Sequence, residues 1–223
     1  MTTRIYLIRH GATQLSAEDR FAGATDVPLS DIGREQARGL SKRLAEDPIV
    51  AVYCSPMKRT IETAQIIAEP HELTPIAREE LSEINHGHWE TMLRSEVESQ
   101  FGEEYAAWEE DPYTFAPEGG ESGISLMARA LPTIRELVER HKNQNVVVVS
   151  HKATIRLILC SFLGIDARGY RDRLDQSPAS LNALDFKDAV RARLMLYNDI
   201  SHYEDHPTRP GAHLSKWWGS NQT

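Results

Sequence analysis

The chain has 223 residues, of which 40% are hydrophobic and 26% are charged, and its formal net charge is −8. This composition is typical of a globular protein and excludes disordered and fibrous classes. No apolar run approaches the roughly 18 residues of a membrane-spanning helix. The negative net charge argues against nucleic acid or an anionic membrane as a partner. The length favours a single domain over residues 1–223.

Two short apolar runs predict buried strands of a parallel sheet, and a histidine follows each of them. Residues 5–8 lead into His10, and residues 146–149 lead into His151. In open α/β sheets, ligands bind beyond the carboxyl ends of the strands. We therefore expect both imidazoles to point into one site.

Helices and strands alternate between these two histidines. A helix is expected over about residues 31–46, with Ser30 or Asp31 as its N-cap and Ile32 on its inner face. After a strand over 49–54, the next helix should use Ser55 as N-cap and Pro56 as its first residue. The remaining expected elements are the end of that helix near residue 68, a short strand over 75–77, one or two polar helices within 92–110, a Pro/Gly-rich loop over 111–121, a helix over 124–138 that Pro132 kinks or restarts, a helix over 153–163, and strands over 180–186 and 192–197.

This alternation predicts a three-layer α/β/α sandwich around a mostly parallel sheet, with the last two strands forming an antiparallel edge. Within the single domain we expect a cap-like insertion over about residues 85–122 and a C-terminal tail over about residues 199–223. Trp217 and Trp218 of this tail are expected to dock on the body or on another subunit.

The two cysteines, Cys54 and Cys160, are expected to be buried free thiols, because they lie in apolar segments without metal-binding spacing. The N-terminus lacks the pattern of a secretory leader, so we expect a cytoplasmic location. A homodimer is compatible with the sequence, although no motif specifies one.

Cationic side chains gather near the predicted strand ends. Arg9 precedes His10, and Arg59 lies in the first turn of a predicted helix, where backbone N–H groups favour an anion. Arginine forks bind phosphate oxygens in pairs. This cluster suits phosphoryl transfer: neutral His10 attacks phosphorus, a cationic His151 holds a phosphate oxygen, and Glu83 protonates the leaving oxygen.

Short motifs occur in a fixed order over about residues 4–160. They are Arg9-His10-Gly11-Ala12-Thr13, Asp26-Val27-Pro28-Leu29-Ser30 with Gly33 and Gln36-Ala37, Ser55-Pro56-Met57-Lys58-Arg59-Thr60 with Thr63-Ala64, Glu83 with Gly87 and Trp89-Glu90, Gly119-Gly120-Glu121-Ser122, and Ser150-His151. In this ordered set the chain resembles the histidine phosphatase superfamily, in its phosphoglycerate-mutase-like branch. Within that branch it looks most similar to metal-independent phosphoserine phosphatases and α-ribazole-phosphatase-like enzymes.

The resemblance implies a phosphoglycerate-mutase-like fold and catalysis without a metal or another cofactor. It implies that His10 is the phosphorylated nucleophile, that Arg9, Arg59 and His151 form the phosphate pocket, and that Glu83 is the proton donor and later the base. Further substrate-binding candidates are Thr13, Ser16, Gly23, His86 and Lys152. Ser16 stands where relatives commonly have asparagine, and Lys152 where a small residue is common. Lys152 either binds a substrate carboxylate or second phosphate or faces outward.

The function predicted from the sequence is hydrolysis of a small phosphorylated metabolite through a phosphohistidine, with inorganic phosphate as a product. One alternative is a cofactor-dependent phosphoglycerate mutase, because the same residues serve both reactions. A second is a metallohydrolase with His10, His86, His151 and Glu83 as ligands. A third is a phospho-ligand-binding module without catalytic activity.

Overall fold

The computed structural model describes residues 2–17 and 20–204, with the side chains of residues 16 and 17 left aside. The expected docking of Trp217 and Trp218, and most of the expected tail, lie outside these residues. The elements in chain order are β1 (Thr3–Arg9), α1 (Gln14–Ala17), α2 (Asp31–Leu44), β2 (Ile49–Cys54), α3 (Lys58–Ala68), η1 (Glu69–His71), β3 (Ile76–Ala77), η2 (Glu79–Leu81), η3 (Gly87–Trp89), α4 (Arg94–Gln100), α5 (Gly102–Glu110), α6 (Gly123–Arg140), β4 (Asn145–Ser150), α7 (Lys152–Leu163), η4 (Ala167–Gly169), α8 (Tyr170–Arg173), β5 (Leu181–Phe186) and β6 (Ala192–Asp199).

The described strands form one six-stranded sheet in the order β3-β2-β4-β1-β5-β6. Strand β4 pairs in parallel with both β1 and β2, and β3 adds in parallel to β2. Strands β5 and β6 extend the sheet in antiparallel orientation on the other side of β1. The predicted mostly parallel sheet with an antiparallel edge is therefore confirmed.

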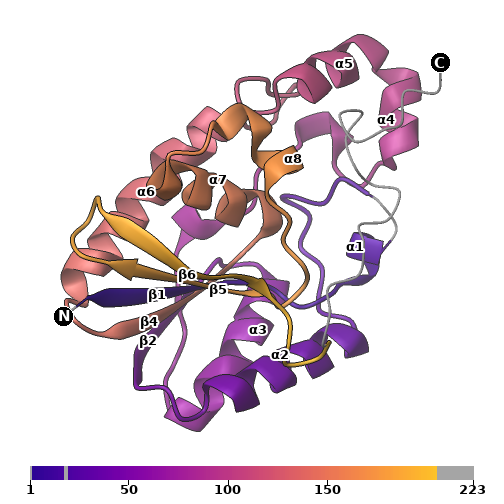
Figure 1. Ribbon diagram of the computed structural model, residues 1–223. Coiled ribbons are helices and arrows are strands. Elements are labelled where there is room, and N and C mark those ends of the chain that lie inside the picture. The colour runs from indigo at the N-terminus through magenta and orange to yellow at the C-terminus, as the bar shows by residue number, and fades with distance from the viewer. Residues whose placement is uncertain (1, 18–19, 205–223) are drawn as a thin grey trace.

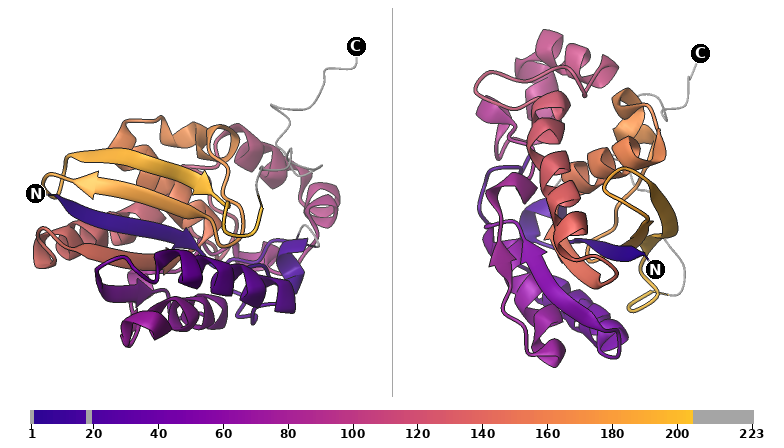
Figure 2. Two further views of the ribbon diagram at one scale, coloured as in Figure 1. Left: turned by 60° about the horizontal axis from the view of Figure 1, so that its bottom comes forward. Right: turned by 90° about the vertical axis from the view of Figure 1, so that its left-hand side faces the viewer.

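Both faces of the sheet are covered, which explains why its central strands are apolar without alternation. Ile5 and Leu7 of β1 pack in a core with α6 and α7, whereas Tyr6 and Ile8 pack in a second core with α2 and α3. Figures 1 and 2 show these two pairs of helices on opposite sides of the sheet. The predicted three-layer sandwich is confirmed.

The segment between β3 and α6 packs around an aromatic cluster of its own. This cluster contains Phe21, Trp89, Val97, Tyr105 and Trp108. Helices α4 and α5 lie at the end of the molecule toward which β1 points (Figures 1 and 2). The guanidinium of Arg171 on α8 lies 3.6 Å from the centroid of the Trp108 ring, which ties this cluster to the main domain.

Other expectations from the sequence can be checked directly. Cys54 and Cys160 are free and buried, as predicted. They belong to the two different cores, one on each side of the sheet. None of the described helices combines the length and apolar character needed to cross a membrane.

One prediction about a helix face is wrong, and one of the two effects expected of Pro132 is excluded. Ile32 is 68% exposed, and Gly33 faces inward instead. A Cβ atom at Gly33 would lie 2.1 Å from the carbonyl oxygen of Ala12, so this contact requires glycine. Pro132 does not restart α6, which is continuous from Gly123 to Arg140 because its apolar stripe is buried both before and after the exposed proline.

The predicted start of α3 is also wrong. This helix begins at Lys58 rather than at Ser55 and Pro56, and its N-cap residue, Met57, provides no side-chain hydrogen bond. Asp26 supplies the missing acceptor from a distant loop, since its Oδ1 accepts a 2.8 Å hydrogen bond from the backbone N–H of Lys58. Ser55 is thereby left for another partner.

Candidate active site

The two histidines meet at the carboxyl ends of β1 and β4. Arg9 and Ser150 are paired in the parallel register, so the residues that follow them lie at the same level. The ring centroids of His10 and His151 are 5.2 Å apart, and both side chains are buried. The backbone N–H of His10 also donates to the carbonyl oxygen of Ser150 at 3.0 Å. The predicted convergence of the two imidazoles is confirmed.

One hydrogen bond fixes the tautomer of His10. Its Nδ1 lies 2.7 Å from the carbonyl oxygen of Gly11. A carbonyl can only accept, so Nδ1 carries the proton and Nε2 keeps its lone pair. Burial lowers the pKa of His10 well below its ordinary value, and the nearby charges of Arg9 and Arg59 lower it further. His10 is therefore a neutral imidazole with a nucleophilic Nε2.

The loop after His10 is held by the start of α2. A Cβ atom at Gly11 would lie 2.3 Å from the carbonyl oxygen of Gly33, so the two backbones touch directly. Gln36 accepts a hydrogen bond from the N–H of Ala12 at 3.0 Å, and Ser30 donates to the Ala12 carbonyl through its N–H and its hydroxyl. These contacts explain why Ser30, Gly33 and Gln36 occur with the His10 motif.

Arg59 is fixed through all three of its nitrogens. Its side chain is 2% exposed. Nε donates to Nδ1 of His151 at 3.3 Å, and the two terminal nitrogens donate to the carbonyl oxygens of Thr25 and Gly23 at 2.8 and 2.9 Å. These bonds use three of the five N–H donors and leave two for a ligand. Burial lowers the pKa of Arg59, and carboxylates led by Glu83 oppose this effect.

Glu90 organises the loop that holds Arg59, a role that sequence reasoning missed. Its Oε1 accepts hydrogen bonds from the backbone N–H groups of Gly23, Ala24 and His86, and its Oε2 accepts from the N–H and the hydroxyl of Thr25. Gly23 itself is packed so closely that an added Cβ would lie 1.7 Å from the carbonyl oxygen of Ile84. The signal was present in the Trp89-Glu90 motif, but no role was assigned to the glutamate.

The hydrogen bonds of His151 are those of a neutral ring, and the cationic ring expected when it holds a phosphate oxygen stays a prediction. Its Nδ1 accepts from Arg59, so the proton of the neutral ring is on Nε2, which donates to Oγ of Ser55 at 2.8 Å. Burial lowers the pKa of His151 well below its ordinary value, with Arg59 adding to the effect. Two buried arginines next to the ring disfavour a third positive charge.

Arg9 lies on the other side of the two imidazoles. One terminal nitrogen donates to the backbone carbonyl of Gln176 at 2.7 Å. The side chain of Gln176 is held in turn by hydrogen bonds with Asn182 and Ser180, which form a buried polar network. Within the described residues, Nε of Arg9 is buried and has no hydrogen-bond partner. Burial lowers the pKa of Arg9 to about 10, so the side chain stays cationic at neutral pH.

Glu83 lies against the N-terminus of α7. Its Oε1 accepts from the N–H of Ile84 and from the N–H and hydroxyl of Thr154, at 3.0–3.1 Å. Its Oε2 accepts one hydrogen bond, from the N–H of Ala153 at 3.0 Å. Oε2 therefore keeps more unused hydrogen-bonding capacity than Oε1.

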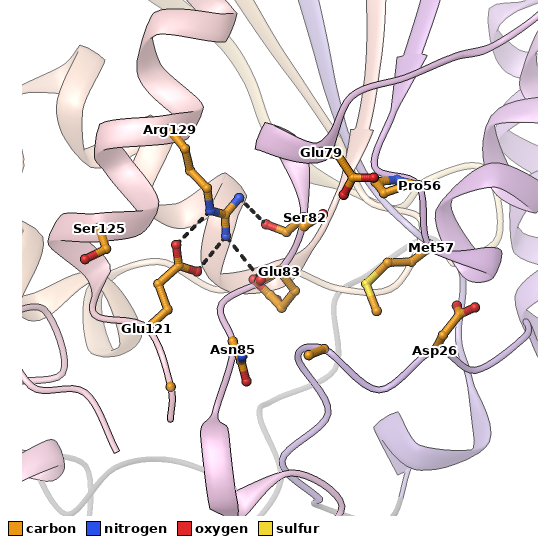
Figure 3. Close-up of a pocket in the computed structure, with 12 residues that line it drawn as sticks. Asp26, Pro56, Met57, Glu79, Ser82, Glu83, Asn85, Glu121, Ser125 and Arg129 are labelled. Atoms are coloured by element: carbon orange, nitrogen blue, oxygen red, sulfur yellow. Dashed lines mark hydrogen bonds and ion pairs between the residues drawn. The ribbon is translucent and has the colours of Figure 1, made fainter. Parts of the chain in front are cut away.

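Arg129 on α6 holds the loop that carries Glu83, and it was also missed from the sequence. Its guanidinium donates to the backbone carbonyl of Glu80. It also donates to the carbonyls of Ser82 and Glu83 and forms a bidentate ion pair with Glu121 (Figure 3). The hydrogen bonds from Arg129 therefore fix the backbone of the loop over residues 80–83. The sequence hinted at this role only through Glu121, the ion-pair partner of Arg129, which belongs to the Gly119-Gly120-Glu121-Ser122 motif.

A pocket of about 620 Å³ lies beside this loop. Figure 3 shows Asp26, Glu79, Glu83 and Glu121 around it, with Arg129 paired to Glu121. Four carboxylates against one paired guanidinium make this pocket unfavourable for a phosphate dianion. Unused N–H donors that suit an anion lie instead on Arg9 and Arg59.

The remaining predicted substrate-binding residues occupy different surroundings. Thr13 is buried in the loop after His10. Ser16 lies in α1, and its side chain is outside the described part of the chain. The ring of His86 packs edge-on against Phe21, with centroids 4.9 Å apart. Lys152 is the first residue of α7, directly after His151.

The metallohydrolase alternative requires a group of metal ligands. Among the described residues, no group of three or more His, Cys, Asp or Glu side chains is placed to hold a metal ion. His10, His151 and Glu83 are instead held by carbonyl, arginine, serine and backbone N–H partners. These hydrogen bonds suit side chains that act as a nucleophile or an acid and base, and differ from the contacts of metal ligands.

Comparison with known proteins identifies the family. Residues 5–200 match the histidine phosphatase superfamily (branch 1). Phosphoserine phosphatase 1 of Hydrogenobacter thermophilus is 37% identical over 163 residues, which cover 73% of this chain and 77% of that protein. Adenosylcobalamin/alpha-ribazole phosphatase of Escherichia coli is 31% identical over 174 residues, which cover 78% of this chain and 86% of that protein.

A solved structure gives the same result. Bacillus stearothermophilus YhfR has a TM-score of 0.85 and 28% sequence identity to this chain, over 91% of this chain and 100% of that one. The predicted fold is therefore confirmed at the level of the whole domain. On both the sequence match and the structural match, the chain belongs to the histidine phosphatase superfamily.

Proposed function

We propose that this protein is a metal-independent phosphomonoester hydrolase that acts on small phosphorylated metabolites through a phosphohistidine at His10. The observation that carries the proposal is a neutral, buried His10 whose Nε2 lone pair is free of a proton, next to two buried arginines. The relatives named phosphoserine phosphatase and alpha-ribazole phosphatase support the same class of reaction.

In the first step, Nε2 of His10 attacks phosphorus and the bond from phosphorus to the alcohol oxygen breaks. Arg9 and Arg59 hold the equatorial oxygens, since each retains N–H donors that the protein does not use. Glu83 donates a proton to the departing alkoxide, which would otherwise be a poor leaving group. Phosphate bound next to His151 raises its pKa, because an opposite charge favours the imidazolium.

In the second step, water attacks the phosphorus and the bond to Nε2 breaks. Glu83, deprotonated by the first step, accepts a proton from this water through Oε2. Inorganic phosphate leaves, and His10 returns to its neutral tautomer with the Nδ1 proton held by the Gly11 carbonyl. The cycle needs one nucleophile, one carboxyl group and fixed positive charge, without a metal.

The test is release of phosphate from a panel of phosphomonoesters, assayed with EDTA present. The wild type should release phosphate, and His10→Asn should lower kcat by at least about 1,000-fold, because the nucleophile is lost. His71→Asn, at the far end of α3, is the matched control and should keep its activity. Full activity of the His10 variant, or loss of wild-type activity in EDTA, would overturn the proposal.

Product analysis separates this function from the mutase alternative. An isomerised phosphoglycerate that forms only with a bisphosphate primer would favour the mutase. The cytoplasmic location and the homodimer stay predictions.

A further inference from the structure

A second group of charged side chains adjoins the phosphate pocket on the side of Arg9. Lys152 and Arg156, both on α7, share one carboxylate oxygen: Oδ1 of Asp175 lies 3.5 Å from Nζ of Lys152 and 3.1 Å from a terminal nitrogen of Arg156. We call these three residues the Lys152 cluster. They were not part of the reaction described above.

Two residues of the Lys152 cluster are sequence neighbours of residues at the phosphate pocket. Lys152 directly follows His151 in the chain. Asp175 directly precedes Gln176, whose carbonyl accepts the hydrogen bond from Arg9. Arg9 also interacts electrostatically with Lys152 and Arg156, so the cluster adjoins the proposed phosphate pocket.

The charges of the cluster are unbalanced. Two cations share one carboxylate, which leaves a net charge of +1 beside the cationic Arg9. Arg156 is 9% exposed, and its Nε has no hydrogen-bond partner within the described residues. Desolvation, with Arg156 and Arg9 adding to it, lowers the pKa of Lys152 to about 7. A buried cation without enough partners, as Arg156 is here, is unstable, so this arrangement favours an added anion.

The side chain of Lys152 is accessible to a ligand, because 42% of its surface is exposed. One ammonium group and a net charge of +1 match a monoanion. Asp175 repels a dianionic second phosphate more strongly than a carboxylate. Of the two anions that the sequence left open for Lys152, the geometry therefore favours the carboxylate.

We propose that the Lys152 cluster is a subsite for a carboxylate carried by the alcohol part of the substrate. The inference rests on the proposed function and narrows its substrate class to phosphomonoesters of small hydroxy acids. Lys152 contacts the carboxylate directly, and Arg156 with Asp175 holds the lysine in place.

The test uses two pairs of esters, each pair differing only by a carboxylate: phosphoserine against phosphoethanolamine, and 3-phosphoglycerate against glycerol 3-phosphate. The readout is the ratio of kcat/KM within each pair at about pH 6. The wild type should prefer the carboxylated member, and Lys152→Met should lower this ratio by about 10-fold, mainly through KM, because one charge-assisted hydrogen bond is lost. Lys142→Met is the matched control, since Lys142 lies just before the amino end of β4, whereas Lys152 follows its carboxyl end, and it should leave the ratio unchanged.

A pH series provides a second readout that a purely structural lysine would not affect. With its pKa lowered to about 7, Lys152 is charged below this pH and neutral above it. The preference of the wild type for carboxylated esters should therefore decline from about pH 6 to about pH 8.5. Lys152→Arg keeps its charge over this range, so its preference should persist at the higher pH.

The outcomes separate the two proposals. If the esters are hydrolysed but Lys152→Met keeps the wild-type ratio in both pairs, the carboxylate subsite is wrong and the proposed function stands. If the wild type hydrolyses none of the four esters and no other phosphomonoester, the proposed function fails, and the subsite fails with it.

Discussion

The protonation of the two active-site histidines is set by their individual partners. The Gly11 carbonyl fixes a proton on Nδ1 of His10, whereas Nε of Arg59 fixes a lone pair on Nδ1 of His151. Both rings have a lowered pKa because they are buried beside arginines. The sequence predicted a neutral His10, but it could not show which nitrogen of His151 carries the proton, because the contact with Arg59 depends on the packing of α3 against β4.

Glu90 provides a test of how Arg59 is positioned. Glu90→Gln replaces an acceptor oxygen by an NH₂ group in a site where all partners are donors, so the loop that holds Arg59 should loosen. We expect KM for phosphomonoesters and the inhibition constant of inorganic phosphate to rise together by about 10-fold, in line with the loss of one or two hydrogen bonds to a charged group.

Glu118→Gln is the matched control for this substitution, because its side chain is exposed in the neighbouring loop. Steady-state kinetics with phosphate as a competitive inhibitor gives both constants. Unchanged phosphate inhibition in Glu90→Gln, with a normal melting temperature, would show that Arg59 does not depend on Glu90.

The elements predicted most accurately are the strands. Strand β2 has the predicted bounds of residues 49–54, because a run of apolar residues between turn-forming residues is covered on both faces. The start of α3 was wrong because its cap comes from Asp26, a residue far away in sequence. Local rules for helix capping cannot anticipate such a partner.

Helix α6 continues through a proline in its interior, where a break is common. Pro132 lacks an N–H and leaves the carbonyl of Ala128 without its usual helical donor. The helix nevertheless continues, because Leu126 and Ala130 before the proline and Ile134 and Leu137 after it are all fully buried in the same core. Burial of these side chains therefore outweighs the cost of the hydrogen bond that Pro132 cannot donate.

Arg129 connects α6 to the loop that carries Glu83. A substitution of Arg129 therefore tests how this contact between two elements supports the site. Arg129→Lys removes the planar fork that binds three backbone carbonyls and Glu121. We expect the free energy of unfolding to fall by about 1–3 kcal/mol, and kcat to fall because Glu83 is less well placed.

Arg135→Lys, exposed on the same helix, is the control and should change neither quantity. Denaturant unfolding and steady-state kinetics measure the two effects. A variant of Arg129 with wild-type stability and kcat would contradict the role assigned to this arginine.

At the scale of the whole molecule, charge is distributed unevenly. The chain carries a net charge of −8, yet Arg9, Arg59, Lys152 and Arg156 gather at one end of the sheet. The neighbouring 620 Å³ pocket is lined instead by four carboxylates, among them Glu83. The proposed phosphate site therefore lies in the cationic part of this end of the sheet.

The sequence predicted where four of the candidate site residues meet, because each lies at or just after the end of a strand or in the first turn of a helix, positions that an α/β sheet brings together. His10, His151, Arg9 and Arg59 were located in this way. Glu90, Arg129 and Gln176 were missed because they act on loops, through backbone groups whose position depends on the folded chain.

The most direct test of the account is capture of the phosphoenzyme. Glu83→Gln removes both the acid of the first step and the base of the second, so this variant is mixed with p-nitrophenyl phosphate, whose leaving group departs without a proton. Quenching in alkali and mapping peptides by mass spectrometry should then reveal phosphate on a nitrogen of His10. The adduct should be labile in acid and absent from His10→Asn. Turnover by the wild type with no phosphorylated His10 in any quenched sample, or with phosphate on another residue, would contradict the account.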